Sequence, residues 1–291
     1  MNLAQFQADP AKCVGCGRCT QVCPGGLLYL SEDRKAKIQD HGSYGWNGCW
    51  RCQHCLAVCP VGAVSVLGCQ PEESVDPPKM ECAASPLSAL IVNRHSCRKY
   101  LDRNVPGETI KAMLDLLACA PNGGNKQQVE YTLIDDKEQM EWFRRLAYSK
   151  METLADQGIY PEGFDKTSYE DMKRWEDTVR PDMLFCGAPH LLIPHAPLGQ
   201  GTPVQDVIIA GTYFELLCAS HGLGAVLMTF PLDAMKHMPE LWSLLGIPES
   251  HYVGMLIGFG FPEIPYARGV QKTLEPERVK RPVFGEEVSE C

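Results

Sequence analysis

Two copies of one cysteine pattern, both within the first 68 residues, constrain this chain more than any other feature. The first copy begins at Cys13 and reads CVGCGRCTQVCP, and the second begins at Cys49 and reads CWRCQHCLAVCP. Both follow C-x2-C-x2-C-x3-C-P, and each precedes a glycine-containing turn and a short apolar segment. A repeat of this kind predicts that one small structural unit occurs twice.

The spacing of these cysteines suits iron–sulfur ligation. Three thiolates two residues apart can surround one face of a cubane, whereas the fourth points away and ligates the other cluster of a pair. The alternative is zinc, but structural zinc sites use C-x2-4-C pairs without a third cysteine at the same spacing. The segment resembles the bacterial two-cluster ferredoxin over its whole length. We predict two [4Fe–4S] clusters, one held by Cys13, Cys16, Cys19 and Cys59, and the other by Cys23, Cys49, Cys52 and Cys55.

The composition excludes several other classes of protein. Fifteen cysteines would also suit a secreted disulfide framework, but the opening segment MNLAQFQADPAKC lacks the basic and apolar stretches of a signal peptide. We therefore expect a cytoplasmic protein. A formal net charge of −9 without a basic cluster predicts binding to neither nucleic acid nor an anionic membrane.

One apolar stretch is long enough to cross a bilayer, namely residues 208–230. Glu215 and His221 interrupt it, and Gly222-Leu223-Gly224 is typical of a helix end followed by a new strand. We expect a buried helix and a buried strand here, and no membrane span.

Residues 69–86 separate an expected N-terminal domain (1–68) from an expected C-terminal domain (87–291). Proline, charged and small residues dominate this segment without an apolar period, which is typical of a linker. Pro77-Pro78 favours an extended, semi-rigid spacer.

From residue 87 onward, apolar residues recur alternately at helical and at strand spacing. The expected helices cover 108–120, 138–154, 204–220 and 232–245, and the expected strands cover 131–134, 190–193, 225–230 and 252–259. This order predicts an α+β domain in which helices cover a central sheet.

Two segments of this domain carry candidate binding groups. The first, RHSCR from Arg94 to Arg98, combines guanidinium forks with a hydroxyl and suits a phosphate, although a solvated basic turn is equally compatible. The second, APNGGNKQ, ends at Gln127. Its glycines allow close approach of the backbone to a ring system, and its amide side chains suit a flavin edge.

Four segments in the same order resemble the nitroreductase family of FMN enzymes over roughly residues 90–283. They are RHSCR, the A-P-x-x-x-N-x-Q segment, residues 210–229 with their Gly-Leu-Gly, and residues 257–262. The resemblance implies an α/β/α sandwich and a homodimer with FMN at the subunit interface, and it places Asp206 and the helix after it at that interface. The chain departs from the family at Gln128–Val129, where many members have Pro-Trp, and at Thr229–Phe230, where Gly-Gly or Glu-Gly is common.

The resemblance also implies which residues contact the flavin. The phosphate ligands are Arg94, Ser96 and Arg98, with His95 alongside, and a C-terminal cation from Lys272 or Arg268. The residues that face the ring system are Asn122, Gly123, Asn125 and Gln127, and those that approach its N5 side are Met228, Thr229 and Phe230.

The remaining aromatic, histidine and cysteine side chains suggest a lid but no further catalytic or metal site. Residues 155–180 are expected to form a lid whose aromatic side chains line a substrate pocket; these are Tyr160, Phe164, Tyr169 and Trp175. Five histidines lack metal-ligand spacing and receive no catalytic role: His190, His195, His221, His237 and His251. The remaining cysteines are interpreted as buried or incidental thiols: Cys69, Cys82, Cys97, Cys119, Cys186, Cys218 and Cys291.

A flavin and two clusters on one chain predict a redox path, in which the protein supplies positioning and the cofactors supply the chemistry. The near-balanced charge of residues 1–68 favours a relay fixed to its own flavin domain over a diffusing carrier. We expect a flavin-dependent iron–sulfur oxidoreductase that takes electrons from reduced ferredoxin or flavodoxin and reduces a small organic acceptor such as a nitroaromatic. The alternatives are an NAD(P)H:ferredoxin oxidoreductase, although no G-x-G-x-x-G opens a helix after a strand, and a non-catalytic electron-transfer module that serves a protein partner.

Overall fold

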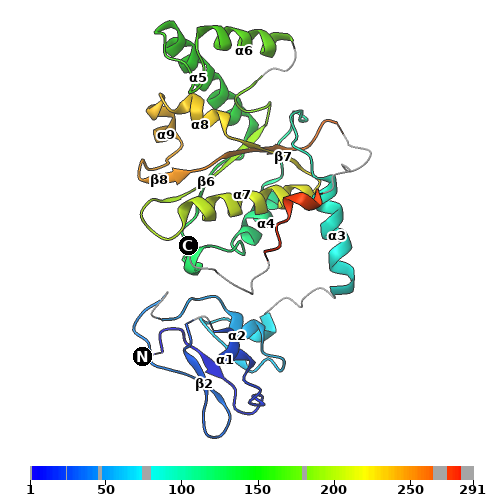
Figure 1. Cartoon of the computed structure of the whole chain (residues 1–291), viewed down its shortest axis with the longest axis vertical. Coiled ribbons are helices and arrows are strands. Elements are labelled where there is room, and N and C mark those ends of the chain that lie inside the picture. The colour runs from blue at the N-terminus through cyan, green and yellow to red at the C-terminus, as the bar shows by residue number, and fades with distance from the viewer. Residues whose placement is uncertain are drawn as a thin grey trace, which may run out of the picture.

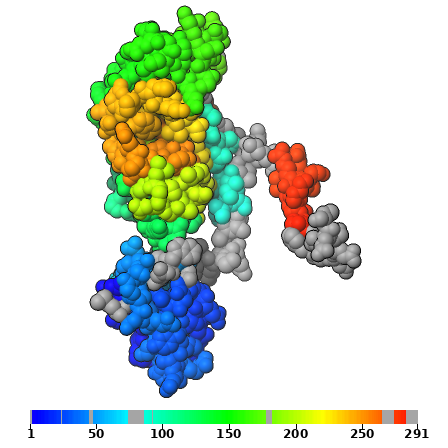
Figure 2. All heavy atoms as spheres, turned by 60° about the vertical axis from the view of Figure 1, so that its left-hand side comes forward, coloured from blue at the N-terminus to red at the C-terminus, as the bar shows by residue number. Residues whose placement is uncertain are grey.

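The structure, a computed structural model, describes residues 2–23, 25–44, 48–73, 80–178, 182–264 and 274–282, without the side chains at 80–85, 92 and 178. Two units follow one another along its long axis (Figure 1). The smaller one contains the cysteine repeat, and the larger one contains a five-stranded sheet with helices on both faces. In the space-filling view, the smaller unit meets one end of the larger unit (Figure 2).

The N-terminal unit repeats its structure as it repeats its sequence. In each copy a short helix begins just before the third cysteine, at Arg18 and at His54. Strand β1 pairs with β4 and β2 pairs with β3, both antiparallel. The elements are β1 (Gln7–Ala8), α1 (Arg18–Val22), β2 (Leu28–Leu30), β3 (Ala36–Ile38), α2 (His54–Ala57), β4 (Val64–Ser65) and the 3-10 turn η1 (Pro71–Glu73).

The apolar core of this unit is small. Phe6, Leu28, Leu56 and Val64 form its centre, and most of the repeat cysteines pack against them. Domains of this size bury too little apolar surface for high stability and commonly use metals as cross-links. Metal ligation by the eight repeat cysteines would therefore also stabilise this unit.

The C-terminal unit is built on an antiparallel sheet in the order β5-β6-β9-β7. The fifth strand, β8, pairs with the last residues of β6, whereas β9 pairs with its first residues. Its strands are β5 (Glu130–Ile134), β6 (His190–Pro197), β7 (Gly224–Met228), β8 (His251–Val253) and β9 (Leu256–Gly260). Its helices are α3 (Met80–Asn93), α4 (Gly107–Leu117), η2 (Gly123–Asn125), α5 (Lys137–Asp156), α6 (Lys166–Thr178), α7 (Pro203–Ser220), α8 (Phe230–Met235), α9 (Pro239–Leu244) and η3 (Pro276–Arg278).

Strand β6 shows how the sheet separates two cores. Its side chains alternate between faces because the strand period is two residues. Leu191 and Ile193 pack in the core that includes α5, α8 and α9, whereas Leu192 packs in the core that includes α4 and α7. The layers in Figure 1 confirm the predicted α/β/α sandwich.

Most predicted elements of this unit are present, and the differences have local causes. The expected strand 225–230 ends at Met228, and Phe230 already belongs to α8. The expected helix 232–245 is two helices, because Pro239 cannot donate a backbone hydrogen bond and instead begins α9. The expected strand 252–259 divides into β8 and β9 around Gly254.

The expected linker is also partly wrong. Helix α3 begins at Met80, so the last seven residues of the segment 69–86 are helical. Pro77-Pro78, on which the extended spacer was predicted, lies outside the described residues.

Helix α7 and strand β7 confirm the interpretation of residues 208–230. The helix ends at Ser220, and Gly222 adopts the left-handed backbone (φ 70°) that commonly closes a helix. Glu215 is buried in the helix at 6% exposure, with a charged partner described below. Across the described residues, no helix has both the length and the apolar character that a membrane crossing requires.

Candidate redox centres

The eight repeat cysteines line two separate cavities. One is lined by Cys13, Cys16, Cys19 and Cys59. The other is lined by Cys23, Cys49, Cys52 and Cys55. The last cysteine of each run thus belongs to the cavity of the other run, which is the division that the spacing predicts for two cubane clusters.

The backbone between these cysteines alternates in handedness in both copies. The residues before and after the second cysteine are left-handed: Gly15 (φ 66°) and Gly17 (φ 74°) in one copy, Arg51 (φ 53°) and Gln53 (φ 58°) in the other. Such alternation turns successive N–H groups into a concavity that suits an anionic group. At Gly15 a Cβ would lie 2.4 Å from the Arg34 carbonyl oxygen, so this position requires glycine.

Burial, neighbouring thiols and backbone N–H groups surround the cysteine sulfurs. Burial raises the pKa of Cys55 to about 12, and its thiol lies beside those of Cys52, Cys23 and Cys49. A thiol with that pKa does not ionise at neutral pH unless a metal ion takes the place of the proton. Backbone N–H groups already donate to two sulfurs, at 3.4 Å to Cys49 Sγ and 3.2 Å to Cys59 Sγ. Hydrogen bonds of this kind tune cluster potentials.

One hydrogen bond joins the second cavity to the C-terminal unit. Asn125 Nδ2, in η2, donates to the backbone oxygen of Trp50 at 2.8 Å. Trp50 follows Cys49 directly and lines the cavity of Cys23, Cys49, Cys52 and Cys55. No spacing argument could have found this contact, because its partners are 75 residues apart.

The predicted phosphate segment lies at one end of α7. Arg94 and His95 line a cavity together with Glu215 and the chain between Gly222 and Ala225. Arg94 Nη1 donates to Glu215 Oε1 at 2.7 Å. Glu215 therefore holds the guanidinium in place over the cavity, a partner that the sequence analysis missed. Ser96 forms a bridge to Ala225 beside this cavity, and Arg98 is exposed.

The predicted ring-facing loop lies at the other end of α7. The Gly123 N–H donates to Asp206 Oδ1 at 2.8 Å, and the Gln127 N–H donates to Asn122 Oδ1 at 2.9 Å. A Cβ on Gly123 would lie 2.2 Å from Thr202 Oγ1, so the loop seats against the helix only with glycine there. Asn125 and Gln127 have positive φ angles of 51° and 54°, a strained backbone of the kind that concentrates at binding sites.

These two predicted parts of a flavin site do not meet within one chain. Asp206, which binds the ring-facing loop, and Glu215, which binds Arg94, lie near opposite ends of α7. Nine residues of helix separate them by about 13 Å. Met228, Thr229 and Phe230 lie at the far end of β7 from Ala225, the bridge partner of Ser96. The remaining predicted ligands, Arg268 and Lys272, lie outside the described residues.

The predicted lid aromatics mostly serve the core. The Tyr160 and Tyr169 rings lie 5.6 Å apart, and the Phe164 and Phe230 rings lie 5.2 Å apart. Tyr169 is only 5% exposed, and Trp175 is half-buried. The pocket-lining role is wrong for Tyr169, because it lies on the apolar face of α6 and is buried in the core that includes α5. Tyr160 and Phe164 precede α6 and pack against the same core while partly buried.

Two family models match different parts of this chain. Residues 91–261 match the model of the nitroreductase family, and residues 12–63 match that of the 4Fe-4S dicluster domain. An uncharacterised ferredoxin of Methanocaldococcus jannaschii is 35% identical over 65 residues, which are 22% of this chain and 80% of that protein. A putative NADH dehydrogenase/NAD(P)H nitroreductase of Methanothermobacter thermautotrophicus is 27% identical over 191 residues, or 65% of this chain and 83% of that protein.

The solved structures show the same fold. A nitroreductase with bound FMN from Bacteroides fragilis superposes with a TM-score of 0.51 at 20% identity, covering 67% of this chain and 97% of that one. The family model spans more than half of the 291 residues, and the family's oxidoreductase domain follows an iron–sulfur domain. The chain therefore belongs to the nitroreductase family and carries a 4Fe-4S dicluster domain ahead of its family domain.

Proposed function

We propose that this protein is an FMN-dependent oxidoreductase in which two [4Fe–4S] clusters relay electrons to the flavin, which reduces a small organic acceptor of the nitroaromatic class. The hydrogen bond between Asn125 and Trp50 carries the proposal. It connects the wall of one cluster cavity to the loop that the family resemblance assigns to the flavin ring.

The flavin assignment rests on the family and on the fit of the residues present. The solved nitroreductase of Bacteroides fragilis binds FMN. In this chain the cavity at Arg94 and His95 suits the phosphate end, since a guanidinium held by Glu215 needs no reorganisation to meet an anion. Bound FMN accepts electrons singly and can pass two to an acceptor, while this chain's residues bind, orient and exclude water.

A second copy of the chain completes the flavin site in this proposal. The Arg94 cavity and the loop at Asn125 lie at opposite ends of α7, so one chain supplies only part of each site. Helix α7 is apolar on both sides: Val207 and Phe214 are fully buried, whereas Ile208 and Tyr213 are more than 40% exposed. A helix that is apolar all round is normally covered on both sides. A homodimer along α7 covers the exposed side and brings one chain's loop to the other chain's cavity.

The order of the clusters follows from the same contact. The cluster of Cys23, Cys49, Cys52 and Cys55 is the one next to the flavin domain, because Trp50 lines its cavity. The cluster of Cys13, Cys16, Cys19 and Cys59 is then the entry point for electrons from an external donor, for which reduced ferredoxin or flavodoxin is our choice.

A second direction of flow has its own support. Relatives from Archaeoglobus fulgidus and Methanothermobacter thermautotrophicus bear names that include NADH dehydrogenase and NAD(P)H nitroreductase. In that alternative, a nicotinamide reduces the flavin directly and the clusters carry electrons out to a ferredoxin.

A matched pair of cysteine variants tests both the order and the direction. Cys59→Ser should remove the entry cluster of Cys13, Cys16 and Cys19, which we call the outer cluster. Cys23→Ser should remove the cluster of Cys49, Cys52 and Cys55, which we call the inner cluster. Each variant leaves all four predicted ligands of the other cluster unchanged. Anaerobic stopped-flow with reduced ferredoxin would follow cluster and flavin absorbance together. We expect cluster bleaching before flavin bleaching in the parent protein and loss of ferredoxin-driven flavin reduction in both variants. Under dithionite, only Cys59→Ser should retain electron transfer from cluster to flavin.

Cys119→Ala, which changes an exposed thiol outside both cavities, is the control. Rapid flavin bleaching by NADPH, followed by cluster reduction, would overturn the inward direction in favour of the second one. Flavin reduction by ferredoxin in the absence of both clusters would overturn the relay itself.

A further inference from the structure

Three side chains that no part of the redox proposal uses converge at one end of the sheet. Glu130 begins β5, His195 lies near the end of β6, and His251 begins β8. Glu130 is the direct partner of His195 across the ladder, and His251 is opposite Pro197, two residues further along the same face. The strand period of two therefore points all three side chains to one side of the sheet.

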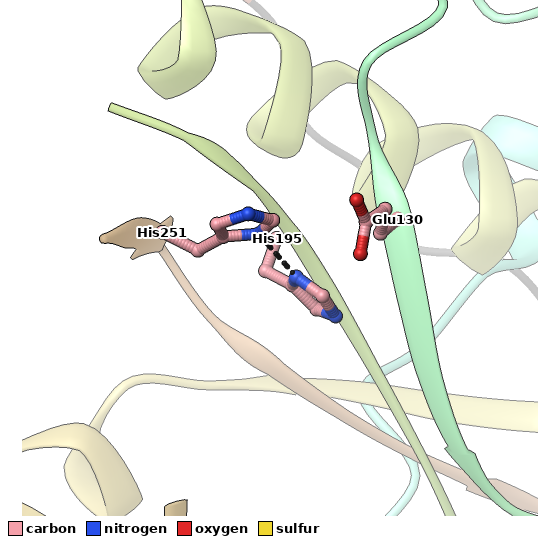
Figure 3. Close-up of side chains that lie close together, drawn as sticks. All are labelled: Glu130, His195 and His251. Carbon is pink, nitrogen blue, oxygen red and sulfur yellow. Dashed lines mark hydrogen bonds between the residues drawn. The ribbon is translucent and has the colours of Figure 1, made fainter. Parts of the chain in front are cut away.

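The three side chains are close enough to share one ion. A ligand atom from each lies within 4.8 Å of the other two. Figure 3 shows the two imidazoles turned toward each other, with the Glu130 carboxylate on the neighbouring strand facing them. The two Nδ1 atoms of His195 and His251 are 2.9 Å apart. Among the described residues, nothing donates a hydrogen bond to the Glu130 carboxylate.

A chain of hydrogen bonds behind His195 fixes which of its nitrogens carries the proton. Thr132 Oγ1 donates its single proton to the Leu245 carbonyl oxygen at 3.1 Å. It can therefore only accept from His195 Nε2, which lies 3.2 Å away. Neutral His195 thus has its proton on Nε2, and the lone pair on its Nδ1 faces His251. Metal-binding histidines are held in this way by a partner on the opposite ring nitrogen.

Burial and access are both suited to a bound ion. His195 is only 3% exposed, so its ring is fixed by packing, whereas Glu130 is exposed and leaves a way in from solvent. A hydrogen bond from His251 to His195 explains the 2.9 Å contact by itself, but it gives no role to the facing carboxylate. The group formed by Glu130, His195 and His251 is also remote from the predicted phosphate ligands. It lies on the sheet face of α5, α8 and α9, and Arg94 lies on the face of α7.

We propose that Glu130, His195 and His251 bind one divalent transition-metal ion of the Zn²⁺ class. Two neutral imidazoles and one carboxylate form a donor set that Zn²⁺ commonly uses, and it leaves one position for water. Such an ion joins β5, β6 and β8 at the end of the sheet where β5 begins. This proposal does not depend on the direction of electron flow or on the flavin.

The test is Zn²⁺ binding to the full-length protein with its clusters intact, after removal of loosely bound metal. Calorimetry gives the stoichiometry and affinity, and X-ray absorption at the zinc edge identifies the ligands. We expect one Zn²⁺ per chain beyond the clusters, with only nitrogen and oxygen neighbours at about 2.0–2.2 Å. Sulfur neighbours at about 2.3 Å would place the zinc in a cysteine site and overturn the proposal.

Variants assign the site without relying on the buried histidine. His251→Ala and Glu130→Gln change positions near the surface, and each should weaken Zn²⁺ binding by at least about tenfold. Thr132→Val removes the hydroxyl behind His195 at nearly constant shape and should weaken binding by about 10–100-fold. His237→Ala, at an exposed histidine elsewhere, should leave the affinity unchanged. Absence of a zinc site in the parent protein, or equal affinity in all four variants, would overturn the proposal.

Discussion

One hydrogen bond fixes which ring nitrogen of buried His190 carries the proton. His190 is fully buried, and its Nε2 accepts from the Val105 N–H at 2.9 Å. An acceptor nitrogen cannot carry a proton, so the proton is on Nδ1, which has no partner among the described residues. Burial lowers the pKa of His190, and the carboxylates of Asp135 and Asp136 oppose this shift only in part.

This arrangement predicts a loss of stability in mild acid. The unfolded chain takes up the proton at the ordinary pKa of about 6.5, whereas the folded chain takes it up only at lower pH. Stability should therefore be complete above that pH and should fall as the pH drops below it. His190→Gln keeps an acceptor for Val105 without a titrating group. It should reduce the slope by up to about 1.4 kcal/mol per pH unit.

Urea midpoints from tryptophan fluorescence between about pH 7.5 and about pH 5.5 measure this slope. His237→Gln, at an exposed histidine, is the control and should behave like the parent. An unchanged slope in His190→Gln would assign the pH dependence to other groups, of which buried His195 is the first candidate, since burial lowers its pKa too.

At the scale of elements, the two cysteine loops reach one conformation with different residues. The first copy has glycine at both left-handed positions, whereas the second has Arg51 and Gln53 there. The left-handed conformation is about 1–2 kcal/mol less favourable for a residue with a Cβ than the right-handed one. Glycine avoids this penalty but loses more conformational entropy on folding, which offsets part of its advantage. The second loop is therefore the more strained of the two, and it is the loop next to the flavin domain.

Gln53→Gly should relieve this strain. We expect the guanidinium midpoint for loss of cluster absorbance to rise, corresponding to about 1 kcal/mol or less. Gln53 is exposed, so the change removes no packing. Gln53→Ala keeps the left-handed penalty and should give no gain. An equal rise in both variants would show that the side chain, and not the backbone, causes the effect.

At the scale of the whole molecule, the proposed electron path depends on how the two units meet. Asn125 is shared between them: its Nδ2 donates to Trp50, and its Oδ1 accepts from Gln127 Nε2 at 3.2 Å. The loop is held to α7 by Asp206 and to the cluster domain by Asn125. One short segment thus connects the proposed flavin site with the inner cluster.

Asn125→Asp tests this connection with a minimal change. The carboxylate can still accept from Gln127 but cannot donate to Trp50, so a single hydrogen bond between the units is lost. A loss of about 1 kcal/mol shifts the contact equilibrium about fivefold. We expect cluster-to-flavin electron transfer to slow by about that factor, with unchanged iron and FMN content.

The matched control is Gln128→Glu, which makes the same amide-to-acid change in the same loop but removes only a bond to Gln200. Flash-initiated or stopped-flow flavin reduction from prereduced clusters gives the rate. Equal slowing in both variants would indicate an effect of charge, and no slowing in Asn125→Asp would mean that electrons take another route to the flavin.

The local features of this protein follow from short-range patterns in its amino-acid sequence. The assignment of eight cysteines to two sites follows from spacings of two and three residues, and the helices and strands follow from apolar periods within single segments. Even their failures were local, as at Pro239 and Gly254, where one residue ends an element.

The contacts between distant side chains, in contrast, depend on the folded arrangement of the whole chain. Arg94 and Glu215 are 121 residues apart, Asn125 and Trp50 are 75 apart, and His195 and His251 are 56 apart. These contacts depend on strand register, on which helix covers which face and on how two units dock, and no short-range pattern encodes them. The spacing of the histidines along the chain predicts no metal site, yet the pairing of β5, β6 and β8 brings two of them together with Glu130.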